Sequence, residues 1–567
     1  MDWQIVALAG LVVIIAAAVF SRRTGVATPL LLVVVGLAVG LVPQVPTIRL
    51  EPELVLAGVL PPLLYSSAVR LPVTDFRRNV RMIAWLSVVM VIVTAVVIGV
   101  VVHLVFPDIS LPLGIALGAV VSPTDAVAAT SIGKRLGLPH RLMTILEGES
   151  LVNDASALVV LRTALAAVAG AFSVWQAIGD FALAVLLAVL VGGAVGLVTV
   201  AIRSRIADPV VTTAISFGIP FVAYFVTEHL HASGVLAVVV AGLVVGHRGM
   251  KRLSVQDRQS EETNWATIQF LLENGVFGLM GLQLPELVAE VVAGPTTITT
   301  AVLVALVVFG LMVVLRVFGS FVPWLVGRYS RTNRLDRRRQ RLDSVTERLA
   351  AADPQTANGA GRLDRMRMQV AMSRADLEFQ AREPITGRGT VVMAWAGMRG
   401  VVTLAAAQTI PTSVPLRAEL VLVAFLVAVV SLIGFGGTLP LVIRRLALPG
   451  VSEEERRNEL TALMQELVES AADRLGPVEE LTVDGEPVDP VVLEKFRGRV
   501  APMLTRRDTA AAPDRTHRDQ VAGLQRQYLA ALRDALHHER SIGAYRTETY
   551  TRAQAMIDKL EVIGGSG

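Results

Sequence analysis

The chain has 567 residues, of which 53% are hydrophobic and only 18% are charged, and its mean hydropathy is +0.59. This composition excludes an ordinary soluble globular protein, and the net charge of +4 gives no reason to expect a nucleic-acid partner. The chain has no cysteine, which excludes disulfides, thiolate metal sites and cysteine nucleophiles.

Apolar residues come in blocks of about twenty, the length that a helix needs to cross about 30 Å of hydrocarbon. The sequence therefore predicts an all-α polytopic membrane protein. The first block lacks a basic flank and an A-x-A cleavage site, so we interpret it as a retained span rather than a signal peptide. About thirteen spans are expected, at residues 3–20, 26–43, 53–69, 82–106, 111–131, 142–169, 177–202, 209–227, 232–246, 264–284, 297–327, 389–410 and 418–443.

Arg and Lys gather in alternate loops between these blocks, for example in residues 21–25, 70–81 and 133–141. Because cytoplasmic loops carry the excess of basic residues, we expect the N-terminus outside and the C-terminus inside, in the cell membrane. Two segments are assigned least clearly. The ninth block is short for a membrane span, and residues 285–295 fit a helix that lies at the membrane interface.

Two charged stretches suggest the domain organisation. Residues 1–445 form a predicted transmembrane domain, and 328–388 within it read as a cytoplasmic charged helical hairpin that breaks at DPQTANGAG, residues 353–361. Residues 446–567 form a cytoplasmic tail rich in helix formers. Both stretches are candidates for regulation, although a solvated coil packed against the membrane domain is the simpler interpretation, and the sequence names no ligand or protein that the tail binds.

The sixth block carries the unusual segment EGESLVNDA at residues 147–155. A charge at the bilayer centre costs about 3 kcal/mol on insertion scales, so each acid here is a functional hypothesis. Ser150 and Asp154 are four residues apart and share one helical stripe, whereas Glu149 and Asn153 share the neighbouring stripe. Glu147 lies a turn nearer the cytoplasm, and we expect it to be dispensable.

The fifth and twelfth blocks are interrupted in ways that favour broken helices. Pro123 removes a backbone hydrogen bond and disfavours helix at the residue before it, which frees carbonyls near Thr124 and Asp125. A simple proline kink is the alternative. In the twelfth block, Arg399 stands between two glycines inside an apolar run. Paired interruptions of this kind, in inverted repeats of six spans, indicate a transporter site at the middle of the membrane, and Arg399 is placed to neutralise half-helix ends there.

Arg316 lies far from both ends of the eleventh block, so a buried acid partner costs less than reaching the membrane surface. Glu149 is the candidate, because it faces a different stripe from Ser150 and Asp154. This leaves Asp154 as the titratable carboxylate. Glu273, in the tenth block, has no assigned partner and is interpreted as a residue of a cavity that faces the cytoplasm.

Five motifs resemble those of the monovalent cation/proton antiporters, in the branch of bacterial electroneutral sodium/proton exchangers. They are PPLLY at 61–65, SPTDAVA at 122–128, EGESLVNDA at 147–155, LRVFG at 315–319 and GMRGVVTLA at 397–405. The resemblance covers residues 1–445. It implies thirteen spans with inverted six-helix repeats, two broken crossing helices, and a homodimer in which a core domain moves like an elevator against a dimerisation domain.

The resemblance also implies roles for single residues. Asp154 would bind the cation or the proton, with Ser150 and Thr124 as further ligands. Glu149 would pair with Arg316, with Asn153 hydrogen-bonded to that pair, and Asp125 and Arg399 would serve the helix crossing. Electrogenic relatives tend to carry an aspartate where this chain has Asn153, so one proton is expected for one cation. Ser66 and Ser67 stand where several relatives carry an acid, and are candidates for additional ligands.

The expected function is therefore exchange of a monovalent cation, sodium before lithium or potassium, for protons, with Asp154 binding one or the other. No cofactor is expected beyond the transported ions, and the working pH range should follow the pKa of Asp154. A proton-coupled potassium exporter or a tail-gated cation channel is the alternative. An enzyme is not expected, because H-E-x-x-H, G-x-S-x-G and Walker motifs are absent from the sequence.

Overall fold

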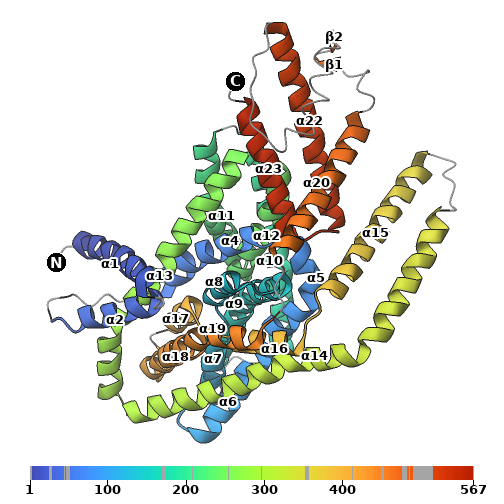
Figure 1. Cartoon of the computed structure of the whole chain (residues 1–567). Helices are drawn as coiled ribbons and strands as arrows, with labels where there is room; N and C mark the ends of the chain where they lie inside the picture. Colours follow the sequence, from blue (N-terminus) through green and yellow to red (C-terminus); the bar gives the residue numbers. More distant parts are fainter. Residues whose placement is uncertain are drawn as a thin grey trace. The chain divides into compact units, whose positions relative to one another are not determined.

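The structure is a computed structural model of the chain. It describes residues 3–24, 28–43, 45, 52–168, 174–206, 208–252, 255–294, 297–350, 357–411, 413–448, 452–475, 482–483, 486–488 and 515–565. Nearly all of these residues are helical (Figure 1), and the described strands are a two-residue antiparallel pair, β1 (Thr482–Val483) and β2 (Glu486–Pro487). The predicted all-α class is confirmed.

The chain divides into two compact units. The first contains residues 1–329 and 385–450, and the second contains residues 330–384 and 451–567. The inserted hairpin therefore shares a unit with the C-terminal tail. We call the two parts the membrane unit and the tail unit.

The membrane unit contains most of the helices. They are α1 (Trp3–Thr24), α2 (Thr28–Gly40), α3 (Pro52–Leu54), η1 (Val55–Val59), α4 (Leu60–Arg70), α5 (Val73–Ala84), η2 (Trp85–Val89), α6 (Met90–Val105), α7 (Leu111–Val121), α8 (Ala126–Leu136), α9 (His140–Val168), α10 (Val174–Arg203), α11 (Pro209–His229), α12 (Gly234–Arg252), α13 (Val255–Ala293), the first part of α14 (Ile298–Ala350), α16 (Gly387–Trp395), α17 (Val401–Gln408), α18 (Arg417–Ser431), η3 (Leu432–Gly436) and α19 (Gly437–Leu446).

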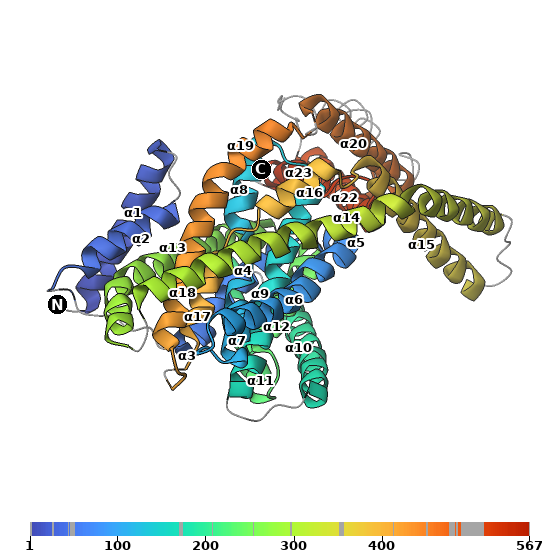
Figure 2. The ribbon, with the colours of Figure 1, turned by 90° about the horizontal axis from the view of Figure 1, so that it is seen from below.

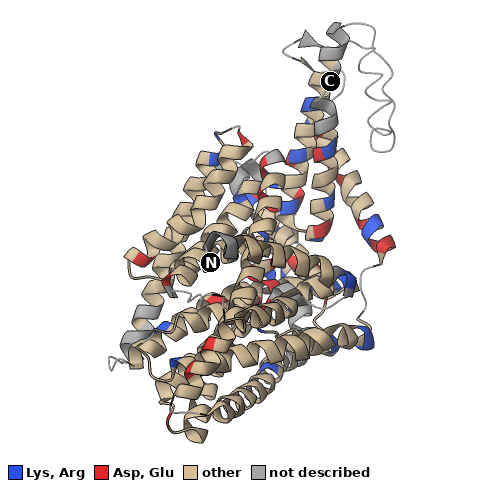
Figure 3. Ribbon diagram, turned by 90° about the vertical axis from the view of Figure 1, so that its left-hand side faces the viewer, with Lys and Arg blue, Asp and Glu red and all other residues tan. Residues whose placement is uncertain are grey.

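Seven helices of the described chain are long and apolar enough to cross a membrane, and five shorter apolar helices accompany them. Figure 3 shows long stretches of these ribbons without a charged residue. Many apolar side chains point outward from them, such as Leu104 and Val314, as expected where lipid replaces water as the solvent. The count of about thirteen spans and the inverted repeats stay predictions.

Two predicted boundaries differ from the structure. Residues 285–293 continue α13, with Pro285 inside the helix, so they form no separate interfacial helix. Likewise α14 runs for 53 residues and passes position 328 without a break. Residues 328–350 contain neither glycine nor proline and are rich in arginine and other helix formers, so nothing local stops the helix where the hydrophobic stretch ends.

The fifth and twelfth predicted spans are both broken. Residues 122–125 separate α7 from α8, and residues 396–400 separate α16 from α17. The breaks touch each other, because the Asp125 N–H donates to the Met398 carbonyl at 2.7 Å. Figure 2 shows α7, α9 and α17 next to one another within the membrane unit.

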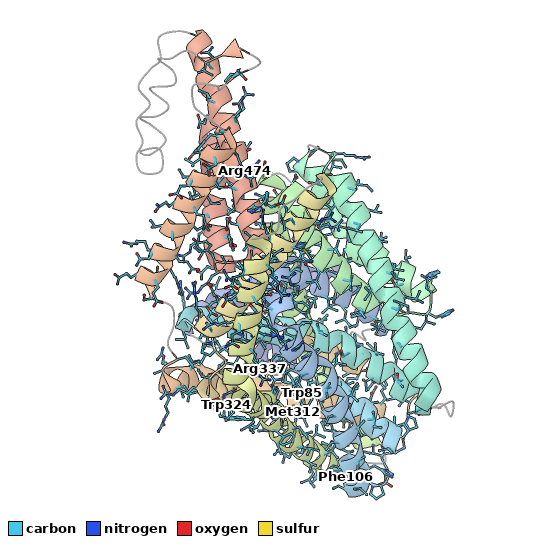
Figure 4. All side chains as sticks on the ribbon, turned by 90° about the vertical axis from the view of Figure 1, so that its right-hand side faces the viewer. Trp85, Phe106, Met312, Trp324, Arg337 and Arg474 are labelled. Atoms are coloured by element: carbon cyan, nitrogen blue, oxygen red, sulfur yellow. The ribbon has the colours of Figure 1, made fainter. Side chains whose placement is uncertain are left out.

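The membrane part of α14 packs along the helix formed by η2 and α6. The Trp85 indole N–H donates to the Gly319 carbonyl at 2.9 Å, and Met312, about two turns earlier on α14, is buried. Figure 4 labels Trp85 on η2 and Met312 on α14, close to each other in that view. The contact fixes the rotation of α14 about its axis, and thereby the direction in which Arg316 points.

In the tail unit, α20 (Glu453–Leu475), α22 (Arg515–Ile542) and α23 (Thr547–Gly565) form a bundle around a core that includes Leu467, Leu536 and Ile557. The second part of α14 and α15 (Ala357–Arg382) form the hairpin. Residues 353–356 of its predicted break lie outside the described residues, and residues 357–361 already belong to α15, so the helix begins earlier than predicted. The hairpin and the bundle meet at Arg546. Its guanidinium contacts Glu383, which follows α15, and Glu459 of α20, each at 3.0 Å.

Candidate functional site

The polar segment of α9 forms the centre of the site. Glu149 and Asn153 are each 1% exposed and Asp154 is 5% exposed, so all three lie deep inside the membrane unit. Residues four apart on a helix share a face. The two stripes accordingly line two different cavities, Ser150 and Asp154 in one and Glu149 and Asn153 in the other.

The first cavity, which we call the Asp154 cavity, has a volume of about 50 Å³. Ser150 and Asp154 enter it from α9, and Thr124 and Asp125 enter it from the break between α7 and α8. Ser67 on α4 contributes from a third direction. The structure thus brings together the acid and the hydroxyls that the sequence analysis assigns to ion binding. The cavity offers hydroxyl and carboxylate oxygens, and of its carboxylates that of Asp154 is the most buried. This donor set suits a hard cation or a proton.

Glu149 is neutralised by a buried arginine. Both terminal nitrogens of Arg316 bind the two Glu149 carboxylate oxygens, and Nη2 also donates to the Met393 carbonyl at 3.1 Å. The bidentate pair joins α9 to α14, and the third bond reaches α16. A bidentate ion pair of this geometry is strong and neutralises Glu149 with Arg316, whereas Asp154 forms no ion pair among the described residues.

Thr124 connects the two stripes. Its hydroxyl donates to Glu149 Oε1 at 3.0 Å and accepts from Asn153 Nδ2 at 2.8 Å. Asn153 therefore reaches the ion pair through Thr124, whereas a direct hydrogen bond to the pair was expected from the sequence. The contact is indirect because the break places the Thr124 hydroxyl between the Asn153 and Glu149 side chains. Thr124 therefore belongs to the backbone break, contacts the ion pair and lines the Asp154 cavity.

Asp125 and Arg399 occupy opposite ends of the broken helices. Arg399 is 2% exposed and donates to the Val121 carbonyl at 2.6 Å and to the Gly397 carbonyl at 2.5 Å, at the C-terminal ends of α7 and α16. Asp125 directly precedes α8, and its carboxylate lies against Gly400, the residue before α17. Arg399 thus places a positive charge at two helix C-termini, and Asp125 places a negative charge at two helix N-termini. Both arrangements are favourable, because each charge has the opposite sign to the helix end that it faces.

Gly400 is required at the crossing because no side chain fits there. A Cβ at this position would overlap the Asp125 carboxylate and its Cβ. We expect Gly400→Ala to lower the free energy of unfolding by about 1–3 kcal/mol and to reduce transport about tenfold or more, since small displacements of a positioned group are costly. Gly437→Ala is the matched control, because nothing lies within 4 Å of a Cβ there. Equal thermal stability and transport in both variants would contradict this account of the crossing.

Ser66 and Ser67 differ in position. Ser67 lines the Asp154 cavity, but Ser66 is absent from its lining, and its hydroxyl lies 2.8 Å from the Leu63 carbonyl and 3.3 Å from Gln269 Oε1. Neighbouring residues on a helix point about 100° apart, and here that rotation separates the two side chains. Of the two, Ser67 lines the cavity, whereas the Ser66 hydroxyl lies against Gln269 of α13.

A family model described as "sodium/hydrogen exchanger, transmembrane" matches residues 10–445, more than half of the chain. The chain belongs to the sodium/hydrogen exchanger family. It is 27% identical to a Mycobacterium tuberculosis protein named as an uncharacterised Na⁺/H⁺ exchanger, over 98% of this chain and 95% of the relative. It is 31% identical to a sodium, potassium, lithium and rubidium/H⁺ antiporter of Bacillus pumilus, over 55% of this chain and 48% of that protein.

The fold of this exchanger also resembles a solved structure. A sodium/proton antiporter of Methanocaldococcus jannaschii, at 15% identity, superposes with a TM-score of 0.54 over 79% of this chain and 99% of the other. The family and the apolar helices make this protein an integral, multi-pass membrane transporter rather than an enzyme.

The exchanger has a second buried ion pair that the sequence analysis missed. Arg203 binds both carboxylate oxygens of Glu261 at 2.9 and 3.2 Å, and Ser216 donates to the same carboxylate at 2.6 Å. The Trp265 indole in turn donates to Ser216 at 3.0 Å. Arg203 lies in a basic stretch at the end of α10, and Glu261 lies in an acidic stretch near the start of α13. In the sequence alone, both positions are therefore typical of side chains that are exposed to water. Only the packing of α10, α11 and α13 reveals the pair.

Glu147 differs from the other acids of α9. Its carboxylate contacts Lys134 at 3.3 Å, and the lysine side chain is 70% exposed. An ion pair this exposed contributes little to stability. Glu147 lines neither cavity, which agrees with the expectation that it is dispensable.

Proposed function

We propose that this exchanger moves one monovalent cation, Na⁺ first, in exchange for one proton, and that Asp154 binds the two in alternation. One observation carries the proposal: of the two most buried acids of α9, Glu149 is neutralised by Arg316, while Asp154 lies in a polar cavity. Among the residues that the structure describes, no Lys or Arg forms an ion pair with Asp154. A carboxylate in that position is available to a proton or a metal cation.

Competition for one carboxylate is sufficient for coupled exchange. A bare charge is costly to move through the membrane interior, whereas a carboxylate neutralised by a proton or by a cation is not. Only the loaded site would then cross, so each cation moved one way requires a proton moved the other way. Ser150 and Thr124 would replace part of the water shell that the cation loses on binding.

The neutrality of Asn153 supports a ratio of one to one, because the α9 stripe next to Asp154 adds no further exchangeable acid. We further propose an elevator motion of the core carrying α9 and the crossing, a homodimer, an extracellular N-terminus, and a cytoplasmic tail in the cell membrane. A proton-coupled potassium exporter is the second candidate. The breadth of cations in the name of the Bacillus pumilus antiporter is the reason to test it.

The proposal is tested with purified protein in vesicles that hold a pH gradient. Addition of Na⁺ is expected to dissipate the gradient. The same measurement with Li⁺, K⁺ and Rb⁺ gives the order in which the protein prefers these cations. Exchange of one for one moves no net charge, so a potential of 100 mV, worth about 2.3 kcal/mol per charge, should leave the rate unchanged. A rate that follows the potential would overturn the ratio, and a response to K⁺ alone would favour the exporter.

A further inference from the structure

The Asp154 cavity has another wall, which α13 and α17 form. Glu273 enters it from α13, and Thr403 enters it from α17. We propose that the Glu273 carboxylate and the Thr403 hydroxyl are additional ligands of the transported cation and set its apparent affinity. The inference rests on the function proposed above and concerns the same site.

Glu273 is held in place as a ligand would be. Gln269, one turn earlier on α13, donates from Nε2 to Glu273 Oε1 at 2.5 Å, and the Ser66 hydroxyl lies 3.3 Å from the Gln269 amide oxygen. This chain of contacts fixes the carboxylate from the side of α4 and leaves its second oxygen available. Within the described part of the chain, Glu273 forms no ion pair with Lys or Arg. Arg70 acts on it only from a distance, with its Nε bonded to the Ser66 carbonyl at 2.9 Å.

Thr403 supplies an independent observation. It is 1% exposed, and its hydroxyl has no hydrogen-bond partner among the described groups. Buried polar side chains are nearly always bonded, so an unpartnered hydroxyl on the wall of a polar cavity needs an explanation. Its lone pairs suit a hard cation, as do carboxylate oxygens. The residue lies three positions after Gly400, in the helix that begins at the second break.

The size of the cavity explains why ligands from both walls are needed. A volume of about 50 Å³ holds only a few water molecules, too few to hydrate a cation completely. Protein oxygens must therefore replace most of the hydration shell, as carbonyl rings do in ion channels. Thr124, Ser150 and Asp154 surround one side only. Glu273 and Thr403 complete the shell from helices that are distant in sequence.

A ratio of one to one requires that Glu273 keeps its charge throughout the cycle, and the dependence of the exchange rate on membrane potential tests this requirement. Asp154 then remains the group that exchanges a proton for the cation, and Glu273 adds a constant negative charge that attracts the cation. Removal of that charge should weaken cation binding without abolishing exchange. This separates the role of Glu273 from that of Asp154.

The test is the Na⁺ dependence of exchange in vesicles. Glu273→Gln keeps an acceptor for Gln269 and is expected to raise the KM for Na⁺ at least about tenfold, equivalent to about 1.4 kcal/mol, with Vmax nearly unchanged. Glu273→Asp should restore much of the affinity. Glu262→Gln, an exposed acid on the same helix, is the matched control and should behave like the parent.

Thr403→Val provides a second test with a different readout. Because its hydroxyl has no hydrogen-bond partner among the described residues, its loss should leave thermal stability unchanged or slightly higher, while the KM for Na⁺ rises several-fold and Thr403→Ser behaves like the parent. Protection of the purified protein by Na⁺ against thermal unfolding should weaken in parallel, since a ligand stabilises the state that it binds.

These measurements separate failure of the inference from failure of the proposed function. A parent protein that exchanges no cation in vesicles overturns the proposed function. A parent that exchanges Na⁺, with unchanged KM and unchanged Na⁺ protection in both Glu273→Gln and Thr403→Val, overturns the inference. A lower stability of Thr403→Val with unchanged KM would also overturn it, because it would assign the hydroxyl a purely structural bond.

Discussion

Replacing Asp154 with Asn is expected to reduce cation-driven proton movement to the level of protein-free vesicles, for every cation and at every pH tested. Asn has the shape of Asp but cannot carry the proton or the negative charge that exchange requires. The variant should nevertheless fold, because the substitution removes a charge from the membrane interior, where a charge costs about 3 kcal/mol on insertion scales. Thermal unfolding in detergent should therefore occur at the parent temperature or above it.

Glu147→Gln is the matched control for Asp154→Asn. Both substitutions neutralise an acid on α9, but Glu147 is bonded to the exposed Lys134 and lines neither cavity. We expect transport within about twofold of the parent, since exposed ion pairs contribute little. Residual Na⁺-dependent proton movement in Asp154→Asn, or its loss in Glu147→Gln, would show that the exchanging carboxylate has been assigned to the wrong residue.

The sequence was sufficient to predict the parts of the site that lie within one helix. The spacing of Glu149, Ser150, Asn153 and Asp154 predicts two stripes, and in the structure these two stripes line two different cavities. The breaks were predictable as well, because Pro123 and the glycines around Arg399 interrupt apolar runs. Local chemistry is sufficient to predict these features.

Contacts between helices were harder to predict. Periodicity says which residues share a face but not which face another helix meets, so Glu273 and Thr403 could not be assigned to the Asp154 cavity. The same limit hid the pairing of Arg203 with Glu261. Arg316 was an exception, since a cation in the middle of an apolar block demands a buried acid and few are available. The high cost of an unpaired charge in the membrane restricts the possible partners of Arg316. An uncharged hydroxyl such as that of Thr403 gives no such restriction.

Loss of Arg316 should have the largest effect on stability. Arg316→Ala leaves Glu149, 1% exposed, without its cation inside the membrane unit, and removes the bond to the Met393 carbonyl. Breaking a buried pair by removing one partner typically costs about 3–5 kcal/mol. We expect a comparable fall in the free energy of unfolding, seen as a lower yield of folded protein and a lower unfolding temperature in detergent.

Two comparisons show whether the stranded charge causes that loss. Arg162→Ala breaks a pair with Glu228 in which the arginine side chain is 43% exposed, so it should cost less than about 1 kcal/mol. In the double variant Arg316→Ala, Glu149→Gln, no buried charge is stranded, and much of the stability should return. Transport should not return with it, because the bidentate pair that joins α9 to α14 stays absent and Thr124 donates to an uncharged amide oxygen instead of a carboxylate. A single variant as stable as the parent would show that the Glu149 charge is neutralised by another group, and the separation of a structural acid from an exchanging acid on α9 would then fail.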